Sequence, residues 1–307
     1  MAWTVYAGDG RRLSVEQTGD LRGRPVFLLH GTPGSKLGPA PRPSLLYRMG
    51  VRLITFDRPG YGDSDRRPGR TVRSAAEDVR LIADALRLDR FGVVGRSGGA
   101  PHALACAALL PDRIARAGAL VSLAPPDAHD LDWYDGMTEG NVQAYVAAAA
   151  GIDHLFEELV GRFLKIREDP AASIVEMHGG LPESDRWIVA DAGIQDMLER
   201  NFAEALRSSP DGWLDDVMAL GTSWGFDVSG ITVPVYLWHG EEDIFAPAQH
   251  TRWLGRNIPT ACVEVEPDAA HFGALRVMTD TIGWASRQDG TDRGGDGSGS
   301  GTDSGQD

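Results

Sequence analysis

Short apolar runs recur along the chain, and most of them end at glycine or proline. They are rich in Val, Ile, Leu and Phe and do not alternate with polar residues, which is typical of strands buried on both faces of a parallel sheet. Strands are therefore predicted at residues 24–31, 51–60, 91–95, 117–126, 231–240 and 261–268. Residues 2–20 differ because they alternate around Gly8-Asp9-Gly10, a pattern that predicts a β-hairpin.

Segments with helical periodicity separate several of these runs. In residues 71–88 the apolar side chains fall three or four positions apart, at Val72, Ala76, Val79, Ala83 and Leu86. Helices that alternate with strands predict an α/β fold, in which right-handed crossovers cover both faces of the sheet.

The alternation stops between residues 129 and 227. No strand pattern is evident there, and several stretches of helix-forming composition follow one another. We therefore predict a helical insertion at residues 129–227 within a core formed by residues 1–128 and 228–286. Residues 287–307 are rich in Gly, Ser and Asp and have no apolar side chain to bury, so a disordered tail is predicted.

Composition narrows the class of protein. The 307 residues carry a formal net charge of −14, which argues against nucleic acid and anionic membrane surfaces as partners. No signal peptide and no apolar run of membrane-spanning length are evident, so a cytoplasmic location is expected. The two cysteines, Cys106 and Cys262, form neither a disulfide framework nor a metal-binding spacing, and we expect no metal and no cofactor.

One serine stands among glycines in Gly95-Arg96-Ser97-Gly98-Gly99. This pattern alone fits an ordinary glycine-rich turn. Here, however, an apolar strand precedes it and an Ala/Leu-rich helix follows it. A serine in that setting sits on a strained turn that exposes its hydroxyl at the carboxyl edge of the sheet, where open parallel sheets carry their sites. Ser97 is the predicted nucleophile.

A serine hydroxyl needs a base and an acid that orients the base. In this architecture the acid follows the nucleophile and the base comes last. Asp243, after the strand at 231–240, is the predicted acid, and Asp127 is the second choice. Glu241 and Glu242 are interpreted as solvated loop charges.

The base must follow the acid, which leaves two histidines. His271 lies in a short loop after the last predicted strand and is the predicted base. His250 lies where a helix begins and is interpreted as a surface residue.

Backbone N–H groups must stabilise the oxyanion of an acyl-transfer intermediate. The amide of Gly98, at a helix N-terminus, and that of Thr32, in the loop after the first parallel strand, are the predicted donors. His30 is expected to brace that loop. The substrate pocket is predicted to include aromatic and apolar residues at the start of the cap, where it should meet the sheet edge, and next to the predicted acid and base: Trp133, Tyr134, Met137, Phe245 and Phe272.

Five segments now occur in a recognisable order, namely "HGTPG" at 30–34, "DRPGYGDS" at 57–64, the elbow at 95–99, "HGEED" at 239–243 and "AAHF" at 269–272. Together they resemble the α/β-hydrolase fold family, over about residues 2–286. The resemblance implies a mostly parallel eight-stranded sheet with helices on both faces and an inserted helical cap, here residues 129–227. It also implies acyl transfer to Ser97 followed by hydrolysis. "DRPGYGDS" is expected to be a structural turn.

Two classes of function are compatible with these residues. The first is a serine hydrolase that acts through an acyl-enzyme on a small to medium apolar carboxylic ester, thioester or lactone. The alternative is a lyase, a cyclase or a ligand-binding protein on the same scaffold, because one fold hosts many functions. The complete triad and two oxyanion donors favour hydrolysis of a small molecule. A homo-oligomer is compatible with the sequence, and Arg96 receives no role.

Overall fold

The computed structural model describes residues 2–287, and these residues form an α/β structure around one sheet. The strand order is β1-β2-β4-β3-β5-β6-β7-β8, in which β2 runs antiparallel to β1 and β4 and the other neighbours are parallel. The strands are β1 (Ala2–Tyr6), β2 (Arg12–Gly19), β3 (Arg24–Leu29), β4 (Val51–Phe56), β5 (Phe91–Arg96), β6 (Ile114–Leu120), β7 (Val235–Gly240) and β8 (Ala261–Glu266). The predicted fold class, including the N-terminal hairpin, is confirmed.

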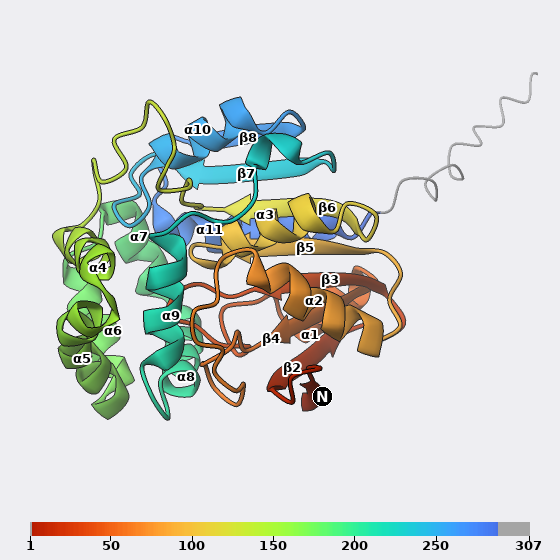
Figure 1. Ribbon diagram of the computed structural model, residues 1–307, viewed down its shortest axis with the longest axis horizontal. Coiled ribbons are helices and arrows are strands. Elements are labelled where there is room, and N and C mark those ends of the chain that lie inside the picture. The colour runs from red at the N-terminus through yellow and green to blue at the C-terminus, as the bar shows by residue number, and fades with distance from the viewer. Residues whose placement is uncertain (1, 288–307) are drawn as a thin grey trace, which may run out of the picture.

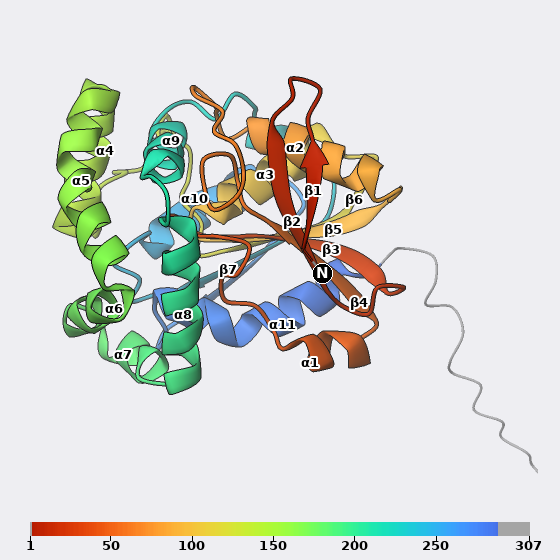
Figure 2. The ribbon, with the colours of Figure 1, turned by 90° about the horizontal axis from the view of Figure 1, so that it is seen from below.

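Helices cover both faces of this sheet (Figures 1 and 2). One face carries α2 (Ser74–Ala85), α3 (Gly99–Leu109) and α10 (Ala248–Asn257). The other carries α1 (Pro43–Arg48) and α11 (Ala274–Ala285).

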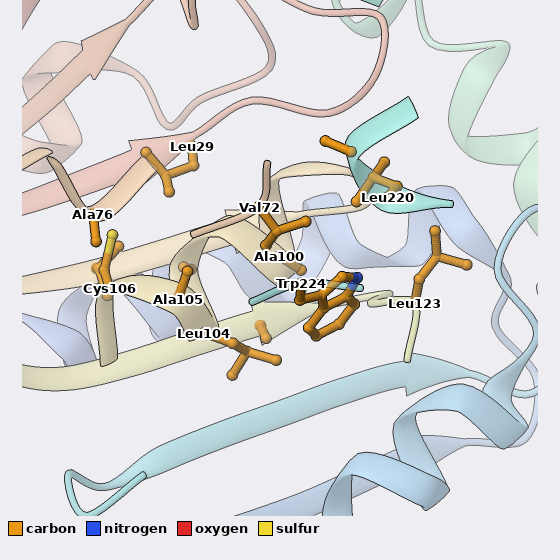
Figure 3. Close-up of a cluster of buried hydrophobic side chains, with 14 of the residues drawn as sticks. Leu29, Val72, Ala76, Ala100, Leu104, Ala105, Cys106, Leu123, Leu220 and Trp224 are labelled. Carbon is orange, nitrogen blue, oxygen red and sulfur yellow. The ribbon is translucent and has the colours of Figure 1, made fainter. Parts of the chain in front are cut away.

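Burial on both faces explains why the strand sequences do not alternate. On β3, Phe27 and Leu29 belong to the hydrophobic cluster on the α2 and α3 side, whereas Val26 and Leu28 belong to the cluster on the α11 side. Successive side chains of a strand point to opposite faces, so each apolar residue is buried whichever way it points. Figure 3 shows part of the first cluster, where Leu29 lies near the α3 side chains.

The cap consists of the helices between β6 and β7. These are α4 (Glu139–Ala150), α5 (Ile152–Glu168), α6 (Pro170–Gly179), α7 (Glu183–Val189), α8 (Ala192–Ala205) and α9 (Asp211–Leu220). They lie beyond the end of the sheet toward which β7 points (Figure 1). Because β3, β5 and β7 run parallel, the loops that follow them face the cap.

Two further predictions concern the ends and the location of the chain. The predicted disordered tail, residues 287–307, lies outside the described residues except for Arg287. Within residues 2–287, no helix is long and apolar enough to cross a membrane.

Candidate active site

Ser97 occupies the turn between β5 and α3. Its φ of 55° lies in the left-handed region, which non-glycine residues rarely adopt and which is maintained only where the surrounding structure enforces it. The neighbouring glycines allow the backbone segments around this turn to pack closely, because they have no Cβ. A Cβ on Gly95 would lie 2.2 Å from the Gly99 carbonyl oxygen, and one on Gly99 would lie 2.3 Å from the carbonyl oxygen of Leu29. The glycine pattern is therefore a steric requirement of this turn.

Asp243 follows β7 and is held by hydrogen bonds to both carboxylate oxygens. Its Oδ1 accepts from the amides of Phe245 at 2.8 Å and Ala246 at 3.0 Å. Its Oδ2 accepts from His271 Nδ1 at 2.7 Å. Burial alone would raise the pKa of Asp243, but the nearby charge of His271 and the hydrogen bonds from His239 and His271 hold that pKa below its usual range.

His271 lies in the short 3-10 helix η2 (His271–Gly273) between β8 and α11. With Nδ1 engaged by Asp243, the other ring nitrogen, Nε2, has no hydrogen-bond partner among the described residues. Ser97 and His271 both line one cavity, although no hydrogen bond joins the Ser97 hydroxyl to the ring among the described residues. Such catalytic hydrogen bonds are often long before substrate binds.

His239, on β7, contacts the carboxylate of Asp243, a contact that the sequence does not predict. Its Nε2 lies 3.1 Å from Asp243 Oδ2 and also contacts the carbonyl oxygen of Ala246, while Nδ1 lies 2.6 Å from Thr251 Oγ1. The Thr251 hydroxyl can donate to Nδ1, so that Nε2 carries the proton toward Asp243. Asp243 Oδ2 is thus placed between two imidazole rings.

The two predicted oxyanion donors lie side by side. A Cβ on Gly98 would lie 3.3 Å from the Thr32 nitrogen and 2.2 Å from its Oγ1, so only glycine fits there. Neither amide donates a hydrogen bond to another described residue. Both residues line the cavity with Ser97. Two backbone N–H groups without an acceptor among the described residues thus line the cavity together with Ser97.

The loop that carries Thr32 is attached to cap helix α9. Asp216 on α9 is fully buried, and its Oδ2 accepts from Thr32 Oγ1 at 2.6 Å and from Tyr61 OH at 2.9 Å. Arg58 and Arg70 form ion pairs with the same carboxylate. Burial would raise the pKa of Asp216, but these two guanidinium groups hold it well below its usual range.

Arg58 fixes the same loop from the core. Its guanidinium donates to the carbonyl oxygen of His30 and, at 2.9 Å, to that of Gly31. The His30 ring lies 2.8 Å from the Gly31 oxygen through Nδ1 and accepts from the Arg58 amide through Nε2 at 3.1 Å. Arg58 and Tyr61 belong to the segment "DRPGYGDS". This segment therefore stabilises the loop that carries His30, Gly31 and Thr32, here called the oxyanion loop. The bracing role predicted for His30 agrees with these contacts.

The cavity has a volume of about 410 Å³ and lies between the sheet edge and the cap. Ser97, His271, Thr32 and Gly98 line it, together with many apolar side chains from the cap. Prominent among these are Tyr145, Leu159, Ile166, Met177, Phe202 and Trp213. Phe245 and Phe272, two of the residues predicted for the substrate pocket, also line this cavity.

The prediction for the other pocket residues needs correction, because Trp133, Tyr134 and Met137 are not among the residues that line this cavity. Trp133 donates from Nε1 to the Ala124 carbonyl at 2.8 Å and packs edge-on against Tyr145, so it lies one layer behind the lining. The Tyr134 side chain is 40% exposed, and Met137 packs against the core.

The structure shows how far His250 and the acidic loop residues are exposed to solvent. His250 is fully buried rather than on the surface, and its Nδ1 accepts from the Ala124 amide at 3.1 Å. Burial lowers its pKa to about 3. Asp127, the second-choice acid, is exposed, as are Glu241 and Glu242.

Comparisons with known proteins identify the family. Residues 24–275 match the sequence profile of the α/β hydrolase fold. The chain belongs to the α/β-hydrolase fold family. This α/β-fold hydrolase is 26% identical to a non-heme chloroperoxidase of Streptomyces lividans over 250 residues, which cover 80% of this chain and 83% of that protein. It is 24% identical to the pimeloyl-(acyl-carrier protein) methyl ester esterase of Nitrosomonas europaea over 265 residues, 84% and 92% of the two chains.

A solved structure agrees on the fold of this α/β-fold hydrolase. The crystal structure of a bromoperoxidase from Bacillus anthracis matches with a TM-score of 0.68 and 21% identity, over 93% of this chain and 97% of that one. At this identity the likeness concerns the fold alone.

Proposed function

We propose that this α/β-fold hydrolase is a serine hydrolase that cleaves a carboxylic ester, thioester or lactone through an acyl-enzyme on Ser97. The observation that carries the proposal is the hydrogen bond of 2.7 Å from His271 Nδ1 to Asp243, beside a cavity that Ser97 also lines. This bond orients the ring and stabilises the imidazolium that forms when the serine loses its proton. The methyl ester esterase among the relatives agrees with this chemistry.

The proposed reaction has two halves. In the first, Ser97 Oγ bonds to the carbonyl carbon while its proton passes to His271 Nε2, and the amides of Thr32 and Gly98 donate to the resulting oxyanion. The leaving alcohol takes the proton from His271 as its bond to carbon breaks. In the second half, water attacks the acyl-enzyme, His271 accepts its proton and returns it to Ser97, and the acid is released.

The cavity supports a substrate with an apolar body of small to medium size. Its lining is mostly apolar, and its volume of about 410 Å³ is at the lower end of the range for small-molecule sites. Each extra methylene in such a pocket changes transition-state binding by only about 1–3 kcal/mol, so a range of chain lengths should be accepted.

A panel of p-nitrophenyl esters with acyl chains of two to eight carbons tests this proposal. The wild-type protein should release p-nitrophenol with a pre-steady-state burst, because acylation precedes hydrolysis of the acyl-enzyme. Ser97→Ala should reduce the rate to the uncatalysed background while the protein remains folded by circular dichroism. Folded wild-type protein that hydrolyses none of these esters would instead favour the lyase, cyclase or binding alternative.

A further inference from the structure

Arg96 is a charged residue of the active site that the proposed mechanism does not use. It is the last residue of β5, directly before Ser97, and it lines the same cavity. Its Nη1 is buried and has no hydrogen-bond partner, and Arg96 forms no ion pair within residues 2–287. A buried guanidinium donor without an acceptor is costly, and a ligand that supplies the acceptor removes this cost.

The guanidinium lies beside the reacting groups. A Cβ placed on Gly31 would lie 3.6 Å from Nη2 of Arg96 and 3.5 Å from the Cβ of Ser97. Its Cζ lies 5.7 Å from the centre of the Phe272 ring, next in sequence to His271. A Cβ on Gly31 would therefore be in van der Waals contact with both Arg96 and Ser97, which places the guanidinium next to the Ser97 side chain.

The nearby carboxylates do not neutralise Arg96 by direct contact. Asp185 and Asp243 act on it electrostatically, but neither forms an ion pair with it. Asp243 is engaged by His271 and His239, while Asp185 accepts from the Phe272 amide at 2.8 Å through Oδ1 and its buried Oδ2 has no hydrogen-bond partner among the described residues. Burial lowers the pKa of Arg96 to about 10, and the two carboxylates oppose that change, so the guanidinium is charged at neutral pH.

The charge of the cavity lining differs in sign from that of the whole protein. The chain has a net charge of −14, yet the lining contains the cations Arg96, Arg162 and Lys165 and one carboxylate, Glu176. Arg162 pairs with Glu158 at 2.6 Å and Lys165 with Glu176 at 3.4 Å. Of the cations lining the cavity in the described part of the chain, Arg96 is therefore the one that lacks a paired carboxylate.

We propose that Arg96 is a specificity-determining residue that binds a carboxylate of the substrate, so that the preferred substrates are anionic esters such as half-esters of dicarboxylic acids. The planar guanidinium matches a carboxylate through two parallel hydrogen bonds, and the apolar surroundings strengthen them. This inference rests on the proposed serine hydrolase function. It adds that the substrate carries a negative charge close to the scissile bond.

Two matched pairs of esters test the inference and locate the carboxylate. On the acyl side, mono-p-nitrophenyl glutarate is compared with p-nitrophenyl valerate. On the alcohol side, 4-carboxyphenyl butyrate is compared with phenyl butyrate. We expect the wild-type protein to favour the anionic member of at least one pair in kcat/KM. Arg96→Gln should reduce that preference about 10- to 100-fold, as expected for loss of a hydrogen bond to a charged group.

Two further variants separate recognition from general electrostatics. Arg96→Lys keeps the charge and should retain part of the preference. Arg80→Gln removes an exposed arginine of α2, whose partner is Asp84 at 3.2 Å, and should retain all of it. The inference is overturned if the wild-type protein favours the neutral member of both pairs, or if Arg96→Gln slows both members of each pair equally.

A binding measurement separates failure of this inference from failure of the proposed function. Monomethyl glutarate should bind Ser97→Ala protein more tightly than neutral dimethyl glutarate in calorimetry, and adding Arg96→Gln should remove the difference. If no ester is hydrolysed but this Arg96-dependent binding is found, the hydrolase proposal fails and the carboxylate site stands. Equal binding of the two compounds to Ser97→Ala protein would overturn the carboxylate site whatever the enzymatic result.

Discussion

Asp243→Asn should lower kcat by about four orders of magnitude without unfolding the protein, as expected when the acid of a triad becomes an amide. The two backbone amides that donate to Oδ1 fix the orientation of the new side chain. Its oxygen would remain at Oδ1, and its NH₂ would take the place of Oδ2, opposite His271 Nδ1. That NH₂ is a donor, so Nδ1 would have to become an acceptor and Nε2 would carry the proton. The ring could then no longer accept the Ser97 proton.

The matched control is Asp127→Asn, which changes the second-choice acid at an exposed position. It should leave kcat within about twofold of wild type, because surface substitutions rarely affect a distant site. Steady-state kinetics on one chromogenic ester measures both variants. An Asp243→Asn protein that keeps more than a tenth of wild-type kcat would contradict the acid assignment, and a large loss in Asp127→Asn would move the acid to the loop after β6.

Asp216→Asn should lower the free energy of unfolding by about 3–5 kcal/mol. The substitution preserves the shape of the side chain but removes the negative charge that pairs with Arg58 and Arg70 inside the protein. Two guanidinium groups would then be buried without a counter-ion. Because Thr32 Oγ1 also donates to this carboxylate, the oxyanion loop should become less ordered, and kcat should fall in the protein that remains folded.

Urea denaturation at neutral pH measures this effect. Asp211→Asn is the matched control, because Asp211 lies on the same helix and pairs with the part-exposed Arg66. Exposed ion pairs contribute about 0–1 kcal/mol, so this variant should unfold close to wild type. If the two variants have equal free energies of unfolding, the ion pairs of Asp216 with Arg58 and Arg70 do not contribute substantially to attaching the cap to the core.

The catalytic candidates could be predicted because each follows a strand whose sequence is distinctive. Ser97 and Asp243 come directly after apolar runs, and parallel strands place the residues that follow them along one edge. The glycines around Ser97 carry a further signal, since a Cβ at either flank would collide with the backbone. Thr32 and Gly98 follow from the same reasoning about strand ends and the helix that begins after the turn.

The cap residues could not be predicted in the same way. Asp216 is one of three acidic residues on α9, more than a hundred residues from Arg58 and Arg70, and only the folded chain brings their charges together. The sequence places Trp133 where the cap should meet the sheet edge, and this position alone predicts a pocket residue. Its indole hydrogen bond to Ala124 turns it toward the core instead.

Covalent labelling of Ser97 tests the central claim most directly. A fluorophosphonate reacts with an activated serine and remains attached, so intact mass and peptide mapping report the modified residue. We expect one adduct per chain, on Ser97, with no adduct in Ser97→Ala and much slower labelling in His271→Ala, because the hydroxyl would lack its base. Labelling of another residue, or an unreactive Ser97 in protein that hydrolyses esters, would contradict covalent catalysis by this serine.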